Sequence, residues 1–347
     1  AEITKPQIFE GVQKMAEALE AYQKENKQQP TQSKEDDFCE ATIDLVSNCP
    51  TFPCDIYIKV GEKTIKAFNK SAELTKEEVI KYKEKGIKSF LVKREDSRQF
   101  VEYISAKVIA ILEDKDLTKQ EKVLSAHDVI METVRELGMS ESVAKAAQTS
   151  VNFTLDYFEK DEETKKLSEF LFGSKDKNYL TAHSVGISYI SVGILKQSAW
   201  DSPENRNKMV MAGLMHDMSV RLPEFTESRF SDEKDLINLK DHGAQTVTLL
   251  NHLKGVPEDV FKIIANHHER PDGSGVPRGM TGAQLSPLTS IFIYSHDAID
   301  AVLELISRKE KVTQNGVEEL LSNFDYGHGK FPKIIEAFKK ANIFEEV

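Results

Sequence analysis

The sequence has few cysteines and lacks any long uncharged apolar run. None of its three cysteines, Cys39, Cys49 and Cys54, is in CxxC spacing. We therefore expect reduced thiols and neither a disulfide framework nor a zinc ribbon. No apolar stretch approaches the roughly 20 residues that cross a bilayer, and no basic-then-apolar signal peptide opens the chain. These absences predict a cytoplasmic protein without a membrane segment, and the first residue, Ala1, leaves a processed or trimmed start open.

An excess of positive charge is also lacking, since the formal net charge is -11. Affinity for long nucleic acid rests on protein cations that replace condensed counterions, so this class of partner is excluded. A small anionic ligand stays compatible if cations or metals are local. With 39% hydrophobic and 30% charged residues, the composition is that of a globular protein. The length of 347 residues suits two domains.

The N-terminal part predicts a small α+β module followed by helices. The first 45 or so residues contain a polar stretch that ends at residues 28–33, and this stretch suggests a helix followed by a linker. Alternation in residues 54–60, a Gly61-Glu62 turn and residues 63–68 predict a β-hairpin. A helix capped by Thr75 and a strand at residues 90–92 complete the module. Amphipathic helices are then expected over residues 100–112, 119–137 and 141–158, and we place a regulatory module at residues 1–155.

The C-terminal part, residues 156–347, predicts a bundle of helices, so the fold class is mainly α. Residues 178–195 carry apolar side chains at spacings of three and four, with His183 on the same stripe. Residues 207–220 include a stretch, 209–215, that is apolar nearly all round, which is typical of a central helix, and this helix ends in His216-Asp217. A helix from Pro257 leads to His267-His268, and residues 288–306 form another apolar helix.

Histidines and aspartates fall where this pattern predicts burial. An ionised aspartate in an apolar interior costs several kcal/mol unless it is paired, and a cation would offset that cost. Helical bundles build metal sites from imidazoles and carboxylates that project inward from several helices. Any one such histidine is more often a satisfied core or surface residue, but an ordered set favours a metal site. The predicted set is His183, His216, Asp217, His242, His267, His268 and Asp297.

Four other histidines remain, and three of them have no such company. We expect His127, His252 and His328 to be structural or exposed to solvent. His296 is ambiguous, because it neighbours Asp297 in sequence but points about 100° away from it on an ideal helix.

The order of these motifs resembles the HD-GYP subfamily of HD-domain phosphohydrolases over about residues 176–340. The run begins with His183, then His216-Asp217, then His242-Gly243. It continues with the segment His267-His268-Glu269-Arg270-Pro271-Asp272-Gly273-Ser274-Gly275-Val276-Pro277, and ends with Asp297-Ala298-Ile299-Asp300.

The resemblance implies two divalent metals, with iron favoured and manganese next. His183, His216, Asp217 and Asp297 would hold one ion, and Asp217, His242, His267 and His268 the other. Asp217 would bridge them as the catalytic residue, and the two cations would activate a water for attack on phosphorus. Some relatives hold a third metal through a glutamate, but Tyr179 stands at that place here.

The sequence departs from the family at two positions. A lysine usual after the HD pair is replaced by Val220, and the tyrosine of GYP by Val276. The nearest match to the family's phosphate-binding basic residues is Arg308-Lys309, although a solvated charge pair at a helix end is the alternative.

The resemblance implies a phosphodiesterase that hydrolyses cyclic di-GMP to linear pGpG or GMP. The alternative, motivated by Val220 and Val276, is a catalytically weak or inactive metal-containing module that binds a nucleotide or docks to a signalling protein. Hydrolysis of another small phosphoester is a third hypothesis. A homodimer is compatible with each.

Overall fold

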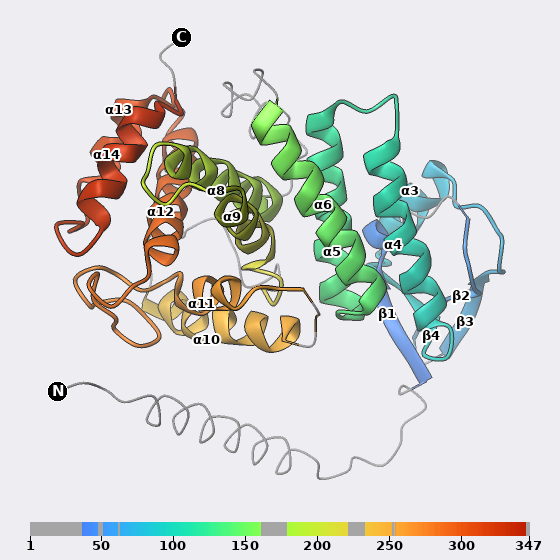
Figure 1. Cartoon of the computed structure of the whole chain (residues 1–347). Helices are drawn as coiled ribbons and strands as arrows, with labels where there is room; N and C mark the ends of the chain where they lie inside the picture. Colours follow the sequence, from blue (N-terminus) through green and yellow to red (C-terminus); the bar gives the residue numbers. More distant parts are fainter. Residues whose placement is uncertain are drawn as a thin grey trace.

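The computed structural model describes residues 37–47, 51–61, 63–160, 179–220, 233–251, 253 and 255–344. The expected N-terminal helix and linker, Cys49 and His252 lie outside this set. A small sheet lies at one end of the molecule and helices α8 to α14 at the other, with α4, α5 and α6 between them (Figure 1). No helix in the described ranges combines the length and the apolar character that crossing a bilayer requires.

The sheet is antiparallel and has the strand order β1-β4-β2-β3. Strands β2 (Ile56–Val60) and β3 (Lys63–Phe68) confirm the predicted hairpin, and β4 (Ser89–Lys93) confirms the predicted strand. The sequence interpretation did not predict strand β1 (Phe38–Thr42), which pairs with β4, or helix α2 (Ile43–Ser47), which follows it. Because this pairing joins segments about 50 residues apart, local composition did not reveal it.

Helix α3 (Lys76–Glu84) begins where the capping signal predicts. The Thr75 hydroxyl accepts from the Glu78 backbone N–H at 3.2 Å, and the Glu78 carboxylate accepts from the Thr75 N–H at 3.0 Å. This reciprocal pair satisfies two N–H groups that would otherwise lack a partner at the helix start. The helix then lays Tyr82 against the rings of Phe68 and Phe90.

Three long helices connect the sheet to the C-terminal part: α4 (Ser97–Glu113), α5 (Lys119–Leu137) and α6 (Glu141–Lys160). Their bounds agree with the predicted ranges to within a few residues. Helix α5 contacts both β1 and α8, while α6 contacts α9. The proposed domain boundary at residue 155 falls inside α6 and stays a prediction.

The C-terminal part is helical, as predicted. Its elements are α8 (Tyr179–Lys196), α9 (Pro203–Met215), α10 (Glu233–Leu250), α11 (Glu258–Asn266), α12 (Pro287–Ser307), α13 (Gln314–Leu321) and α14 (Phe331–Ala341). The second of these helices was expected to end in His216-Asp217, and the structure agrees. Helix α9 ends before His216-Asp217, and the Val220 N–H donates to the Asp217 carbonyl in the turn that follows. His216 and Asp217 therefore lie in the turn that follows α9 and not along the helix itself.

Candidate metal centre

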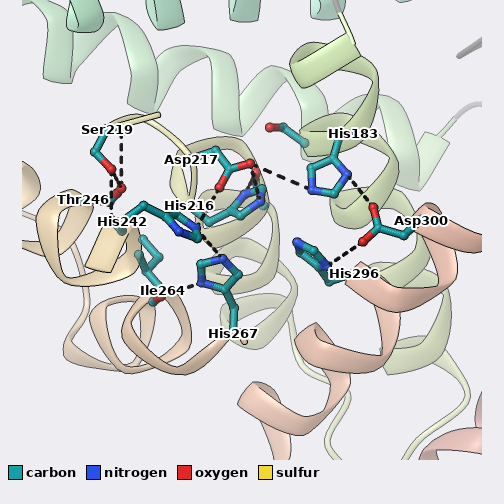
Figure 2. Close-up of polar contacts among 12 residues, drawn as sticks. His183, His216, Asp217, Ser219, His242, Thr246, Ile264, His267, His296 and Asp300 are labelled. Carbon is teal, nitrogen blue, oxygen red and sulfur yellow. Dashed lines mark hydrogen bonds and ion pairs between the residues drawn. The ribbon is translucent and has the colours of Figure 1, made fainter. Parts of the chain in front are cut away.

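Histidine and aspartate side chains from α8, α10 and α12, and from the ends of α9 and α11, meet in one interior region (Figure 2). His183 and His216 are 0% exposed, and Asp217 is 3% exposed. The other members close to this group are His242, His267, His268, His296 and Asp300. Groups that prefer water are thus buried together.

Asp217 occupies the middle of this region (Figure 2). Its Oδ2 lies 3.2 Å from His216 Nε2 and 4.0 Å from His183 Nε2, and its Oδ1 lies 3.3 Å from His242 Nε2. Burial alone would raise the pKa of Asp217, but the charge and hydrogen bonds of His216 and His242 hold it well below the usual range. The carboxylate is therefore ionised and faces three imidazoles.

Backbone carbonyls fix the orientation of two rings. The Nδ1–H of His216 donates to the Gly213 carbonyl at 2.9 Å, and that of His267 to the Ile264 carbonyl at 2.6 Å. A carbonyl only accepts, so Nδ1 carries a proton in both rings, and Nε2 is the nitrogen left for another partner. Both Nε2 atoms face the centre.

The Asp300 carboxylate orients two more rings. Asp300 Oδ1 lies 3.4 Å from His183 Nδ1, and Asp300 Oδ2 lies 3.4 Å from His296 Nδ1. A carboxylate behind an imidazole is the usual support of a histidine that binds a metal, since it orients the ring and makes it more basic.

The remaining rings come from α10 and the end of α11. His242 Nε2 lies 2.9 Å from His267 Nε2, and the His268 ring centroid lies 4.0 Å from that of His267. Gly243 permits this approach, because a Cβ there would lie 2.6 Å from the Ile264 carbonyl oxygen. Any larger residue would push α10 away from α11 and separate the histidines.

The electrostatics favour neutral imidazoles at this end of the cluster. Burial lowers the pKa of His267 and of His268 well below the usual value, and neighbouring imidazoles lower both further. A neutral imidazole is the form that binds a metal. Burial would also lower the pKa of His296, but the adjacent Asp300 carboxylate raises it.

This donor set fits divalent cations. Donor atoms lie within 4.8 Å of one another in the groups His183-His216-His296, His242-His267-His268 and His216-Asp217-His267. Imidazole with carboxylate suits iron, manganese, zinc or cobalt better than calcium. A cation would also offset the cost of burying the Asp217 charge and would give the converging Nε2 lone pairs a partner.

The structure brings six of the seven predicted metal ligands into one cluster and holds the seventh, Asp297, beside it. The Asp297 carboxylate accepts a hydrogen bond from the Tyr326 hydroxyl at 2.5 Å. One of its oxygens also lies within 4.8 Å of a possible metal-ligand atom of His296 and of Asp300. Burial raises the pKa of Asp297. The assignment of all seven residues as ligands remains a prediction.

Glu269, next to the paired histidines, has a structural part in the glycine loop. Its carboxylate is buried and accepts from the backbone N–H groups of Arg278 and Met280, both at 2.7 Å. The loop is closed further by the Val276 N–H, which donates to the His268 carbonyl at 3.0 Å. The backbone of Val276, the residue that replaces the tyrosine implied by the family resemblance, thus lies next to that of His268.

The predicted substrate residues lie at the far end of α12. Arg308 follows Asp297 by about three turns, roughly 16 Å along a helix axis, and pairs with Glu304 at 2.6 Å. Arg308 and Lys309 are both exposed. This placement matches the alternative of a solvated charge pair, and a substrate contact stays a prediction.

Among the other histidines, His127 is buried on α5 and His328 is exposed, within the two kinds expected. Our sequence interpretation gave no role to Asp300 and left His296 ambiguous. The signal that could have found them is their spacing of four residues, which puts both on one face of α12.

Comparison with known proteins agrees with this geometry. Residues 171–315 match the family described as HD domain. A protein of Pseudomonas aeruginosa named cyclic di-GMP phosphodiesterase is 26% identical over 166 residues, which are 47% of this chain and 39% of that protein. A Thermotoga maritima protein named cyclic di-GMP phosphodiesterase is 33% identical over 81 residues, or 23% of this chain and 21% of that protein. The chain spans less than half the length of these relatives.

A solved structure shares the fold across most of the chain. It is described as an HDG"Y"P protein from Bdellovibrio bacteriovorus, and has a TM-score of 0.56 at 16% identity, with 88% of this chain and 99% of that chain covered. The region that carries the histidine cluster is therefore similar to HD domains and to parts of two proteins named cyclic di-GMP phosphodiesterase, and the chain shares its fold with the solved structure.

Proposed function

We propose that this chain is a metal-dependent phosphodiesterase that hydrolyses cyclic di-GMP to linear pGpG or GMP. The observation that carries the proposal is the meeting of an ionised, buried Asp217 with imidazoles from separate helices. The names of two relatives supply the substrate. A metal-containing site of this kind does not need a nucleophile from the protein.

His183, His216, Asp217 and Asp297 would hold one divalent cation, and Asp217, His242, His267 and His268 the other. Iron is favoured and manganese comes next. When bound, the pair supplies Lewis-acid stabilisation of the phosphodiester and activation of water. The protein's own contribution is to keep Asp217 ionised, to turn the imidazole lone pairs inward, and to exclude bulk water.

The test is hydrolysis of cyclic di-GMP by protein loaded with iron without oxygen, or with manganese, and followed by chromatography of the nucleotides. Asp217→Asn keeps the side-chain volume and removes the charge, so we expect at least a ~100-fold loss, above the range of lost supporting contacts. His328→Gln, an exposed histidine outside the cluster, is the matched control and should keep full activity. Loaded wild-type protein that leaves the nucleotide intact would refute the proposal.

The alternative function is nucleotide binding or docking without turnover, and Val220 and Val276 favour it. Val220 is 3% exposed, so no cation is supplied where the family resemblance implies a lysine. This alternative predicts calorimetric binding of cyclic di-GMP without products. In the double variant Val220→Lys/Val276→Tyr, a gain in hydrolysis would support lost catalysis, whereas no gain would weaken that explanation.

The N-terminal part is proposed to regulate this centre through α5. Asp128 on α5 accepts a hydrogen bond from the Thr181 hydroxyl on α8, two residues before His183. Thr181→Val removes the hydroxyl at nearly constant shape. If the contact transmits a signal, this variant should alter the hydrolysis rate while the metal content stays that of the wild type, and an unchanged rate would count against regulation by this route.

A further inference from the structure

His296 lies inside the histidine cluster, although the family resemblance gives it no role. It is 6% exposed, and its ring centroid lies 4.7 Å from that of His183 and 5.1 Å from that of His268. The rings of His267 and His216 are 5.5 and 5.7 Å away. Four predicted ligands therefore lie close to this residue, and Figure 2 shows three of them, His183, His216 and His267.

The orientation of the ring is set from behind. Asp300 Oδ2 lies 3.4 Å from His296 Nδ1, and the other oxygen of the same carboxylate lies 3.4 Å from His183 Nδ1. One carboxylate thus supports both imidazoles in the same way. His183 presents its Nε2 to Asp217 at 4.0 Å, and ligand atoms of His183, His216 and His296 lie within 4.8 Å of one another.

Burial of a histidine does not by itself produce this arrangement. His127 is equally buried, but its Nε2 makes no hydrogen bond and it belongs to no group of converging ligand atoms among the described residues. An ion pair between His296 and Asp300 would explain only the Nδ1 contact. The grouping of His296 with two predicted ligands requires a further partner.

We infer that His296 is an additional ligand of the metal ion that His183 and His216 hold, binding through Nε2, with Asp300 as the positioning residue for both rings. The inference rests on the metal centre of the proposed function but not on hydrolysis. With His183, His216, Asp217 and Asp297, His296 would give this ion five protein ligands, against four for the ion of Asp217, His242, His267 and His268. The ion with fewer protein ligands is then the one with more room for substrate.

The test compares His296→Gln with the wild type in metal binding alone. Each protein is loaded with manganese, freed of excess metal by gel filtration and analysed for metal, and cobalt-substituted samples are compared by absorption spectroscopy. The variant should lose the ion of His183 and His216, or bind it at least ~10-fold more weakly, and should change the cobalt spectrum. His183→Gln should give the same loss, while the buried control His127→Gln should behave as the wild type.

Unchanged metal content, affinity and cobalt spectrum in folded His296→Gln would overturn the inference and leave His296 as an ion-pair partner of Asp300. If the variant does not fold, a crystal structure of the zinc-loaded wild type decides. The distance from His296 Nε2 to zinc should be about 2.0–2.1 Å. A distance that differs from this range by more than about 0.2 Å would reject ligation. Because no nucleotide is present, failure of cyclic di-GMP hydrolysis does not affect either result.

Discussion

The interior of the sheet-containing module includes a cluster of aromatic rings, whereas the interior between α8, α9, α11 and α12 holds a cluster of imidazoles and a carboxylate among its apolar side chains. In the module, Phe68 lies 5.0 Å from Phe52, 5.7 Å from Tyr82 and 5.9 Å from Phe90, measured between ring centroids. Such rings gain free energy simply by leaving water. The buried Asp217 and its histidines gain none, because removal of a charge or a polar nitrogen from water costs free energy.

The comparison teaches that the two interiors depend on different conditions. An aromatic core is complete once the chain has folded. A core of converging lone pairs and one buried charge is complete only when cations occupy it, because metal binding contributes directly to the free energy of folding. Conditions that remove metal should therefore distinguish the two regions.

The largest expected effect is that of metal removal. At a metal concentration one hundred times the dissociation constant, each bound ion would add about 2.7 kcal/mol to the free energy of unfolding, so the two ions proposed above would add about 5 kcal/mol. After chelation, hydrogen exchange should rise in α8, α9 and α12 and stay constant in β2, β3 and β4. Added manganese should restore protection, and an equal rise in both regions would contradict the comparison.

The converse change is Phe90→Ala in the module. This ring is 0% exposed and packs on Phe68 and Tyr82. Its truncation leaves a cavity, so we expect the free energy of unfolding of the module to fall by about 3–5 kcal/mol, as measured by denaturant titration. Metal content per folded chain should not change. A parallel loss of metal would show that the cluster depends on the aromatic core.

The burial of His127 predicts that the free energy of unfolding depends on pH, whereas an exposed histidine such as His328 should add no such dependence. Burial, and next the charge of Arg135, lower its pKa in the folded chain to about 3, below the value of about 6.5 for an unfolded chain. Below about pH 6.5 the unfolded chain gains a proton that the folded chain does not. Stability is therefore full above that pH and falls as the pH drops toward 3.

His127→Gln removes this titration. Between pH 6 and 4, we expect the variant to lose stability less steeply than the wild type, by about 1.4 kcal/mol per pH unit, as measured by urea unfolding at each pH. Exposed His328→Gln serves as the control and should keep the wild-type slope. Equal slopes in wild type and His127→Gln would show that His127 becomes protonated without unfolding.

Much of the fold followed from local signals in the sequence. Helix α5 has the predicted bounds because Thr118 supplies an N-cap and Gly138, with a φ of 82°, ends it. Strand β1 escaped prediction because its partner β4 lies far along the chain. Long-range pairing leaves no periodic mark on so short a segment.

The candidate metal centre shows the same difference between local signals, which the sequence reveals, and long-range contacts, which it does not. Apolar stripes predicted that His183 and Asp217 are buried. They did not predict which nitrogen His216 and His267 turn inward, since this depends on the Gly213 and Ile264 carbonyls. His296 was ambiguous for another reason. Helix α12 is buried on almost every side over residues 291–299, so no single apolar face indicated which of its polar residues meet the other helices.

The smallest expected effect lies on α5, the helix that contacts both regions. The Thr118 hydroxyl accepts from the Glu121 N–H at 3.2 Å, and the Glu121 carboxylate accepts from the Thr118 N–H at 2.8 Å. Thr118→Ala leaves the Glu121 N–H unsatisfied and should lower the free energy of unfolding by about 1 kcal/mol, whereas Thr118→Ser should lose much less. Because α5 packs on β1 and on α8, hydrogen exchange should rise in both elements, and a rise in only one would show that the two regions unfold separately.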